Sequence, residues 1–408
     1  MGRRGNKRNA ELKLALRTLD IMNWSLRALN AILFPYTSRT IENLRTKAGK
    51  ILILRTGNIG DTACALPGLI AIRKSFPKCH ITLLTSPGPK GLPEAGEVLG
   101  GLRVVDKIIT FYIHDVKNKY FMRQLIKNLR SYHYDLFIRM GQDGVSYFRT
   151  LRDLCFARLL DVKGAFGFEI TNYFPFFDKR RLKDYVPQNQ VERILSSLAD
   201  KKIIGNNFEV CLPESDIAFG EEFLQKSGVN EGDLLIGIHM GTKVQANRWP
   251  IENFIGLCNL ISTNYPNSFF FFTGSGKEYE IIKNTLNYIN GRKAIVAGKA
   301  SILQTAAIVK KCNLFITVDS GIMHLAALLN VPIIAIFSAR QYPNMWYPWG
   351  NNHVIFRKKT PCELCFLTEC SHRTCLKAIT VEEVFRAVQR LLVGGGALNL
   401  IRDGKEPV

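Results

Sequence analysis

An aspartate in a glycine-containing turn is the first candidate for chemistry in this sequence. Asp61 closes the segment 56–61 (TGNIGD), which follows the apolar run 51–54 and precedes a helical pattern that continues to Phe76. This order predicts a strand, a tight turn and a helix start. A carboxylate placed there either caps the helix or faces a ligand crevice as a general base, because ligands of open α/β sheets bind beyond the carboxyl ends of the strands.

The turn lacks both of the common phosphate-binding fingerprints. Gly57 and Gly60 are not followed by the third glycine of GxGxxG, and no Gly-Lys-Ser/Thr follows as in a P-loop.

A second strand, turn and helix start lies near residue 320. The segment 317–327 reads TVDSGIMHLAA. Ser320 and Gly321 let backbone N–H groups approach an anion, the serine hydroxyl can donate a hydrogen bond, and the helix dipole adds to the attraction. A diphosphate fits there. The alternative is an ordinary capped helix with Asp319 or Ser320 at the N-cap.

Two further turns of the same half carry polar side chains. Thr242 and Arg248 lie just before the helical pattern 251–263, and Glu278 ends the turn 273–278 (TGSGKE), where its carboxylate could accept hydrogen bonds from ribose hydroxyls. Three such turns on one sheet predict a nucleotide-diphosphate pocket.

The elements that must position these turns alternate between strands and helices. The pattern predicts strands at 51–54, 80–85, 104–111 and 134–140, and again at 234–239, 268–273, 294–297, 313–318 and 332–337. We therefore expect an α/β fold with two doubly wound domains facing a central cleft. The expected division is an extension at 1–49, domains at 50–213 and 214–392, and a tail at 393–408. Residues 86–101, with five glycines and three prolines, are predicted to form a loop.

Four motifs together resemble a known family. GNIGDTACALPGL, RWPIENF, TGSGKE and VDSGIMHLAALLNVPIIAIF occur in the order and approximate spacing of the ADP-heptose:lipopolysaccharide heptosyltransferases, glycosyltransferase family nine. The resemblance covers roughly residues 50 to 392. It implies the GT-B architecture, with two Rossmann-like domains that bind the acceptor mainly in the first and the ADP-sugar mainly in the second. It also implies inversion at the anomeric centre without a metal.

The resemblance assigns roles to individual residues. Asp61 matches the general base, which deprotonates the acceptor hydroxyl, in an acceptor-side loop that contains Gly57, Asn58 and Gly60. On the donor side, the matching positions are Thr242 and Arg248 at the diphosphate, Glu278 at the ribose, and Asp319, Ser320, Gly321 and His324 in the donor motif.

One position departs from the family pattern. Many members read Lys-x-Trp-Pro or Lys-Arg-Trp-Pro, whereas this chain has Asn247, Arg248, Trp249 and Pro250, so the usual lysine is absent. Arg248 either supplies the charge, since a guanidinium can bind phosphate oxygens bidentately, or points elsewhere.

Four of the ten cysteines lie within a short segment. Cys362, Cys365, Cys370 and Cys375 would suit a structural zinc ion, and an iron–sulfur cluster is chemically possible. The alternative is a loop of reduced thiols. The catalytic reaction itself is expected to need no cofactor.

The net charge of +21 favours an anionic partner, and residues 1–50 contain eleven Lys or Arg against three Asp or Glu. Residues 11–34 place leucines at helical spacing with basic residues between them. We predict an amphipathic helix that either lies on an anionic membrane, with Trp24 and Phe34 at the interface, or packs on the body of the protein. With neither a cleavable secretory signal nor a transmembrane helix expected, the predicted location is cytoplasmic, peripheral at the inner face of the inner membrane.

The sequence thus predicts an inverting, metal-independent glycosyltransferase that moves heptose from ADP-heptose to a lipopolysaccharide inner-core or related glycolipid acceptor. The alternatives are a GT-B transferase for another nucleotide sugar and a non-catalytic relative that binds lipid or nucleic acid. No nucleic acid partner is expected on the first interpretation.

Overall fold

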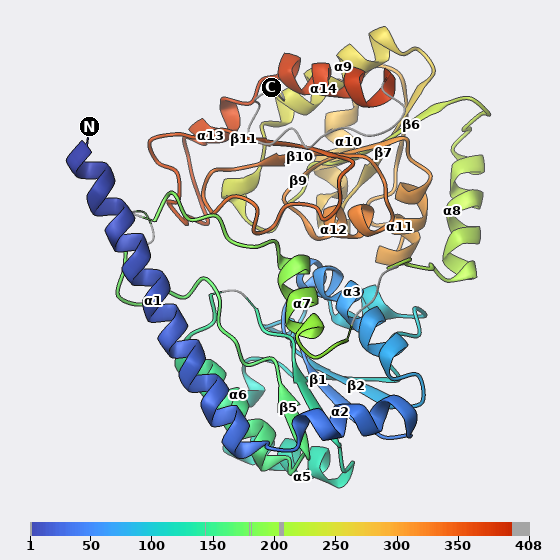
Figure 1. Cartoon of the computed structure of the whole chain (residues 1–408). Helices are drawn as coiled ribbons and strands as arrows, with labels where there is room; N and C mark the ends of the chain where they lie inside the picture. Colours follow the sequence, from blue (N-terminus) through green and yellow to red (C-terminus); the bar gives the residue numbers. More distant parts are fainter. Residues whose placement is uncertain (1, 143, 179, 181, 204–207, 394–408) are drawn as a thin grey trace. The chain divides into compact units, whose positions relative to one another are not determined.

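The described residues form two compact units, Met1–Phe208 and Glu209–Val408, here called the N-terminal and C-terminal units (Figure 1). A computed structural model describes residues 2–142, 144–178, 180, 182–203 and 208–393. The division falls close to the expected boundary at residue 213. Most of the expected tail, residues 394–408, lies outside the described residues.

A five-stranded parallel sheet is the centre of the N-terminal unit. Its strands have the order β3-β2-β1-β4-β5. Every neighbouring pair is parallel. The strands are β1 (Lys50–Leu54), β2 (His80–Thr85), β3 (Lys107–Thr110), β4 (Leu136–Arg139) and β5 (Gly164–Phe166). Because helices cover both faces, β1 reads as a continuous apolar run without alternation.

Helices flank this sheet on both faces. Leu52, Phe137 and Ala165 pack with α5 (Lys119–Ser131) and α6 (Tyr147–Leu159). The helix α3 (Ile59–Ser75) lies against α7 (Gln190–Ala199) and α4 (Ala95–Leu99). The presence of α4 corrects the prediction of a loop throughout 86–101: the stretch from Ala95 to Leu99 forms a short helix because Ala95, Val98 and Leu99 turn one apolar face inward.

The N-terminal extension is a long helix, α1 (Gly2–Leu33), followed by α2 (Thr37–Thr46). In Figure 1 it runs beside α6, and the Ser25 hydroxyl lies 3.0 Å from the Tyr147 hydroxyl of that helix. One face of α1 is buried through Ala15, Leu19 and Leu26. The helix therefore packs on the body of the protein along one face.

The outer face of α1 remains apolar. Leu14, Ile21, Trp24 and Ile32 are all more than half exposed, and Trp24 is 71% exposed. Phe34, in contrast, is 3% exposed and belongs to the core of the N-terminal unit. The expectation that Phe34 lies at a membrane interface is therefore wrong: the helix ends at Leu33, and the chain turns inward there.

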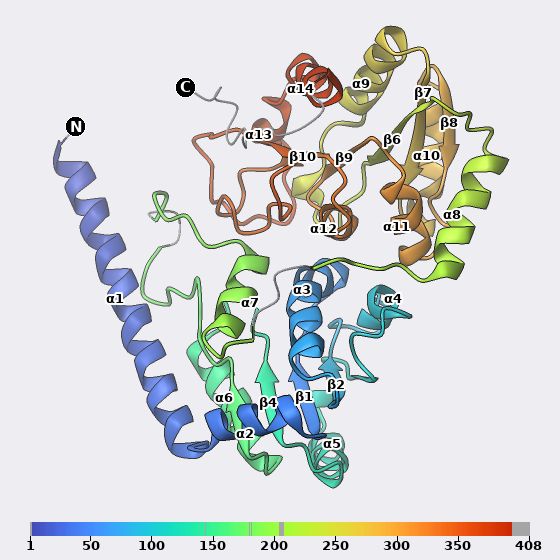
Figure 2. The ribbon, with the colours of Figure 1, turned by 45° about the vertical axis from the view of Figure 1, so that its right-hand side comes forward.

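A six-stranded parallel sheet is the centre of the C-terminal unit (Figure 2). Its order is β11-β10-β9-β6-β7-β8, with β6 (Leu234–His239), β7 (Ser268–Thr273), β8 (Arg292–Ile295), β9 (Leu314–Val318), β10 (Ile333–Phe337) and β11 (His353–Arg357). One face packs against α9 (Ile251–Asn264), α10 (Tyr279–Leu286) and α14 (Val381–Val393). The other packs against α8 (Glu214–Lys226), α11 (Ile302–Lys310) and α12 (Gly321–Leu328).

The expectation of two doubly wound α/β domains is confirmed. Among the strands of the described residues, the sequence prediction missed β5 and β11, two edge strands that each pair with a single neighbour. In β7, next to the edge strand β8, the run Phe269 to Phe272 is almost fully inaccessible to solvent. In the described residues, no helix combines the length and apolarity needed to cross a bilayer.

Candidate active site

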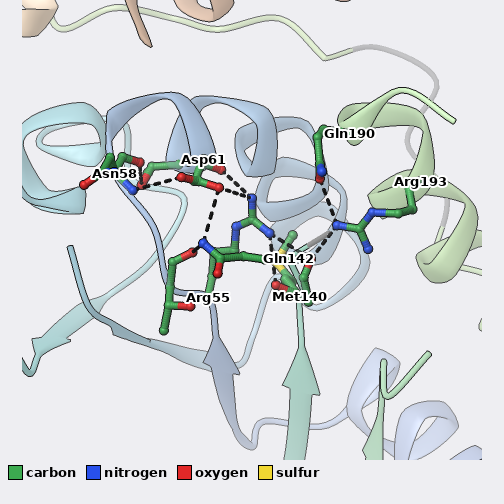
Figure 3. A network of polar contacts seen from close by, with 10 residues as sticks. Arg55, Asn58, Asp61, Met140, Gln142, Gln190 and Arg193 are labelled. Atoms are coloured by element: carbon green, nitrogen blue, oxygen red, sulfur yellow. Dashed lines mark hydrogen bonds and ion pairs between the residues drawn. The ribbon is translucent and has the colours of Figure 1, made fainter. Parts of the chain in front are cut away.

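Asp61 lies in the first turn of α3, directly beyond the carboxyl end of β1 (Figure 3). Its Oδ2 accepts a hydrogen bond of 3.1 Å from the backbone N–H of Asn58, the N-cap residue. Its Oδ1 lies 3.4 Å from Arg55 Nη2 and accepts from Gln142 Nε2 at 3.3 Å. The predicted capping role of Asp61 is therefore confirmed, and it uses Oδ2. The other oxygen, Oδ1, faces the side chains of Arg55 and Gln142, which the sequence analysis did not include.

Arg55 holds the turn together. It is 2% exposed, and its Nη1 donates to the carbonyl oxygens of Met140 (3.2 Å) and Gly141 (2.8 Å), while Nη2 donates to the Asp61 carbonyl oxygen at 3.0 Å. A buried guanidinium needs a countercharge and satisfied N–H groups. Asp61 supplies the charge and the carbonyls accept from Nη1 and Nη2, whereas Nε has no hydrogen-bond partner among the described residues. These bonds fix the turn after β1 and the segment after β4 to each other.

Gly57 is required by the same turn. Its φ of +133° lies in the region that favours glycine, and a Cβ added there would come within 2.3 Å of the Asp61 side chain. Gly57 thus gives the Asp61 carboxylate its room. Gly60 already belongs to α3.

The first turn of α7 extends this network (Figure 3). Arg193 Nη2 donates to the carbonyl oxygen of Gly141 and, at 2.9 Å, to Gln190 Oε1. A cavity of about 160 Å³ adjoins these groups and is lined in part by Gly141, Gln188 and Arg193. The N-terminal unit therefore offers a carboxylate, an amide and cationic groups at one edge of its sheet.

In the C-terminal unit, Asp319 is the centre of a second polar cluster. It follows β9 and precedes Ser320, the N-cap of α12, whose hydroxyl lies 3.1 Å from that of Thr317. Burial raises the pKa of Asp319 to about 6, while the positive charge of Arg340 and a hydrogen bond from Asn247 oppose this rise. Asp319 can therefore change its protonation state just below neutral pH.

Asn247 occupies the position of the absent family lysine. Its Nδ2 donates to Asp319 Oδ2 at 2.9 Å, and its Oδ1 accepts from the Ser338 hydroxyl at 2.6 Å. The short 3₁₀ helix η3 (Gln245–Asn247) presents this amide, and the neighbouring Trp249 anchors it, since its buried indole donates to the carbonyl of Ile379.

Thr242 and Glu278 lie where β6 and β7 end. Glu278 Oε2 accepts from the backbone N–H and the hydroxyl of Ser275, both at 2.7 Å. A Cβ on Gly241 would come within 1.8 Å of Glu278 Oε1, so the loop carrying Thr242 packs directly on this carboxylate. Burial lowers the pKa of the adjacent His239, whereas the negative charge of Glu278 acts to raise it.

His324 lies at the end of the first turn of α12 and is buried. Burial lowers its pKa to about 4, so the imidazole is neutral near pH 7. Its ring meets that of Trp346 edge to face, with centroids 6.2 Å apart. At the carboxyl edge of the C-terminal sheet, the fold thus gathers Thr242, Glu278, Asp319, Ser320, Gly321 and His324, all of which the sequence analysis singled out.

Arg248 lies at the surface. Its side chain is exposed, and its carbonyl oxygen accepts a hydrogen bond from Arg373. The cation that faces Asp319 is Arg340, which the sequence analysis did not include.

The cysteine segment 362–375 follows β11. Cys362 is exposed, and Cys365, Cys370 and Cys375 are half-buried; all four are free thiols. Across the part of the chain that the structure describes, no three His, Cys, Asp or Glu side chains are grouped so as to hold a metal ion. Metal binding stays a prediction, which metal analysis of protein purified without a histidine tag tests: less than about a tenth of an equivalent of zinc or iron contradicts it.

Comparison with known sequences identifies the family of this chain. The profile of "Glycosyltransferase family 9 (heptosyltransferase)" matches residues 122–376, which is more than half of the chain. The chain belongs to glycosyltransferase family 9. Its relatives in that family include the lipopolysaccharide core heptosyltransferase OpsX of Haemophilus influenzae, which is 24% identical over 366 residues, covering 85% of this chain and 99% of the relative. Lipooligosaccharide heptosyltransferase 2 of Campylobacter jejuni is 26% identical over 225 residues, covering 53% of this chain and 67% of the relative.

Solved structures of glycosyltransferase family 9 share the fold. The enzyme from Veillonella parvula has a TM-score of 0.67 at 19% identity and covers 85% of this chain and 98% of its own. The ADP-heptose lps heptosyltransferase II of E. coli has a TM-score of 0.61 at 18% identity and covers 85% of this chain and 100% of its own. The predicted GT-B architecture is confirmed, and this family member is a glycosyltransferase enzyme.

The residues that the sequence analysis missed are Arg55, Gln142, Arg193, Ser338 and Arg340. Arg55, Gln142, Ser338 and Arg340 follow β1, β4 or β10 within a few residues, so the rule that ligands bind beyond strand ends was an available signal. Arg193 has no comparable signal, because α7 joins the network only through tertiary packing.

Proposed function

We propose that this glycosyltransferase transfers heptose from ADP-heptose to a lipopolysaccharide inner-core or related glycolipid acceptor, with inversion and without a metal ion. The carrying observation is the Asp61 carboxylate, fixed beyond β1 by the N-cap N–H, Arg55 and Gln142. A carboxylate has about four acceptor positions, so one that receives these bonds can still accept a proton from a bound hydroxyl.

The reaction needs few steps. Asp61 removes the proton of the acceptor hydroxyl, the oxygen attacks the anomeric carbon, and the bond from that carbon to the diphosphate oxygen breaks, with the electron pair leaving on ADP. Negative charge develops on the departing diphosphate. The N-terminus of α12, where Ser320 and Gly321 lie, offers backbone N–H groups and the positive end of a helix dipole to this charge.

The proposed acceptor is met at the anionic inner face of the inner membrane. The exposed apolar residues on α1 and the eleven basic residues within positions 1–50 support this part of the proposal. The expected location is therefore cytoplasmic and peripheral.

Donor identity is tested by calorimetric titration with ADP, UDP and GDP in parallel, in the absence of metal. Selective ADP binding is expected. A preference for UDP or GDP would change the donor while keeping the reaction class, and no binding to any of the three would contradict the proposal.

Replacement of Asp61 tests the base. Asp61→Asn keeps an acceptor oxygen at the helix start but cannot take up the proton, so turnover should fall about a hundredfold or more. In this variant, ADP affinity should stay within about twofold of wild type. Asp20 is exposed, and in the control Asp20→Ala both turnover and ADP affinity should stay within about twofold of wild type. Turnover near the wild-type rate in Asp61→Asn would remove Asp61 from the role of base.

A further inference from the structure

A buried cation stands beside Asp319. Arg340, just after β10, is 7% exposed, and its Nε and Nη2 donate to the carbonyl oxygens of Leu367 and Phe366. The charges of Arg340 and Asp319 act on each other. Within the described residues Nη1 has no hydrogen-bond partner, so this amino group is available to a ligand.

The surroundings of Arg340 form a recess. A narrow cavity is lined by Asn247, Asp319, Ser338, Arg340, Trp346 and Arg357, among others. Its volume is about 10 Å³, room for roughly one water molecule, so a larger ligand binds at its mouth. Asp319 directly precedes the N-cap of α12, so the recess lies next to the N–H groups at the start of that helix. A guanidinium held by two carbonyls is pre-organised, because the arginine side chain loses little further conformational entropy when a ligand binds.

The charges of the recess decide what it can bind. A nucleoside diphosphate brings negative charge close to the ionised Asp319, which repels it. Asn247 cannot offset this repulsion, because its amide is neutral and both of its ends are already bonded, to Asp319 and to Ser338. Arg248 is exposed and bonded through its backbone to Arg373. Two guanidinium groups line the recess together with Asp319, those of Arg340 and Arg357. Arg357 is paired with Glu363 at 3.6 Å and donates to the carbonyl oxygens of Ala339 and Gln341, so Arg340 is the cation whose charge acts on Asp319.

We propose that Arg340 binds the diphosphate of the sugar-nucleotide donor, supplying from the loop after β10 the positive charge that is missing at position 247. This inference rests on the proposed function, because it takes the donor to be a nucleoside diphosphate sugar. It also gives Asn247 a different role, since the amide positions the Asp319 carboxylate.

The test compares ADP with AMP by calorimetry, using the full chain. In Arg340→Gln, ADP affinity should fall about tenfold or more, the size expected for a lost charge-assisted hydrogen bond. AMP affinity should change by less than about threefold, so the preference for ADP shrinks. Arg390→Gln, at an exposed arginine in the last turn of α14, is the matched control and should leave both affinities within about twofold.

Moving the charge gives a second measurement. The double variant Asn247→Lys with Arg340→Gln should recover part of the lost ADP affinity, since position 247 also lines the recess and the lysine restores a positive charge there. If Arg340→Gln fails to fold, Arg340→Lys allows the same comparison, because an ammonium cannot hold both loop carbonyls and the ligand as a guanidinium does.

Two outcomes would overturn the inference. Equal loss of ADP and AMP affinity would mean that Arg340 acts only on structure, and unchanged ADP affinity would mean that it does not bind the diphosphate. Failure of the proposed donor is distinguishable: if the wild type prefers UDP or GDP, the same comparison is made with that diphosphate and its monophosphate.

Discussion

The two carboxylate oxygens of Asp61 have different partners. Oδ2 caps α3 through the N–H of Asn58, and Oδ1 faces Arg55 and Gln142. A residue with a helix to cap has a fixed rotamer, so the capping bond also orients the oxygen proposed to act as base. The two interpretations that the sequence left open, helix cap and general base, are therefore compatible in one side chain.

Gly57→Ala tests how closely Asp61 depends on its turn. The added Cβ would come within 2.3 Å of Asp61, so we expect the carboxylate to shift and turnover to fall at least about tenfold, with ADP affinity unchanged. Gly91→Ala is the matched control: Gly91 also has a positive φ (+90°), but a Cβ there meets nothing within 4 Å. Equal effects of the two substitutions on turnover would show that backbone strain alone is responsible.

Asp319 should set the acidic limb of the pH profile. Its pKa is raised to about 6 by burial, so lowering the pH through 6 protonates it. We propose that the ionised carboxylate accepts hydrogen bonds from the hydroxyls of the donor sugar, and protonation removes this acceptor. We expect kcat/KM to fall below about pH 6. The charge of Arg340 works against the rise, so Arg340→Gln should move the limb to higher pH. If the acidic limb keeps its position in Arg340→Gln, the charge of Arg340 does not influence the pKa that sets this limb.

At the scale of elements, α1 joins one buried and one exposed apolar face in a single helix. Ala15, Leu19 and Leu26 fix it to the N-terminal unit, while Ile21, Trp24 and Ile32 are left on the outside with Lys13 and Arg17 nearby. A helix attached in this way needs no folding step at a membrane. Its outer face can enter the lipid interface directly.

Polar substitutions on that face should release the protein from membranes. We expect Ile21→Asn with Trp24→Ser to weaken sedimentation with phosphatidylglycerol-containing vesicles about tenfold or more, because two large apolar side chains leave the interface. Tyr288→Ser, an equally exposed aromatic position in the C-terminal unit at 69%, is the control. Unchanged sedimentation of the double variant would rule out this face as the contact.

For the whole molecule, the sequence predicted those strands and site residues that a local pattern specifies. Runs such as Ile51 to Leu54 and Phe269 to Phe272 are buried on both faces, and their apolar continuity is visible without a structure. The edge strand β5 has three residues and carries no such run. Asp61, Glu278 and Asp319 lie at the expected strand ends. Arg193, in contrast, joins the network through Gly141, a partner distant in the chain, and no local pattern specifies such a contact.

The anchoring of Arg340 links the donor recess to the cysteine segment. Its guanidinium is held by the carbonyls of Phe366 and Leu367, and Cys370 donates its N–H to Gln245, in the same 3₁₀ helix as Asn247. The thiol segment thus supports Arg340 directly and Asn247 through Gln245, two residues that line the recess. Linkage between two such sites is reciprocal: by whatever factor oxidation or metalation of the thiols changes nucleotide affinity, bound nucleotide changes the thiols' own equilibrium equally.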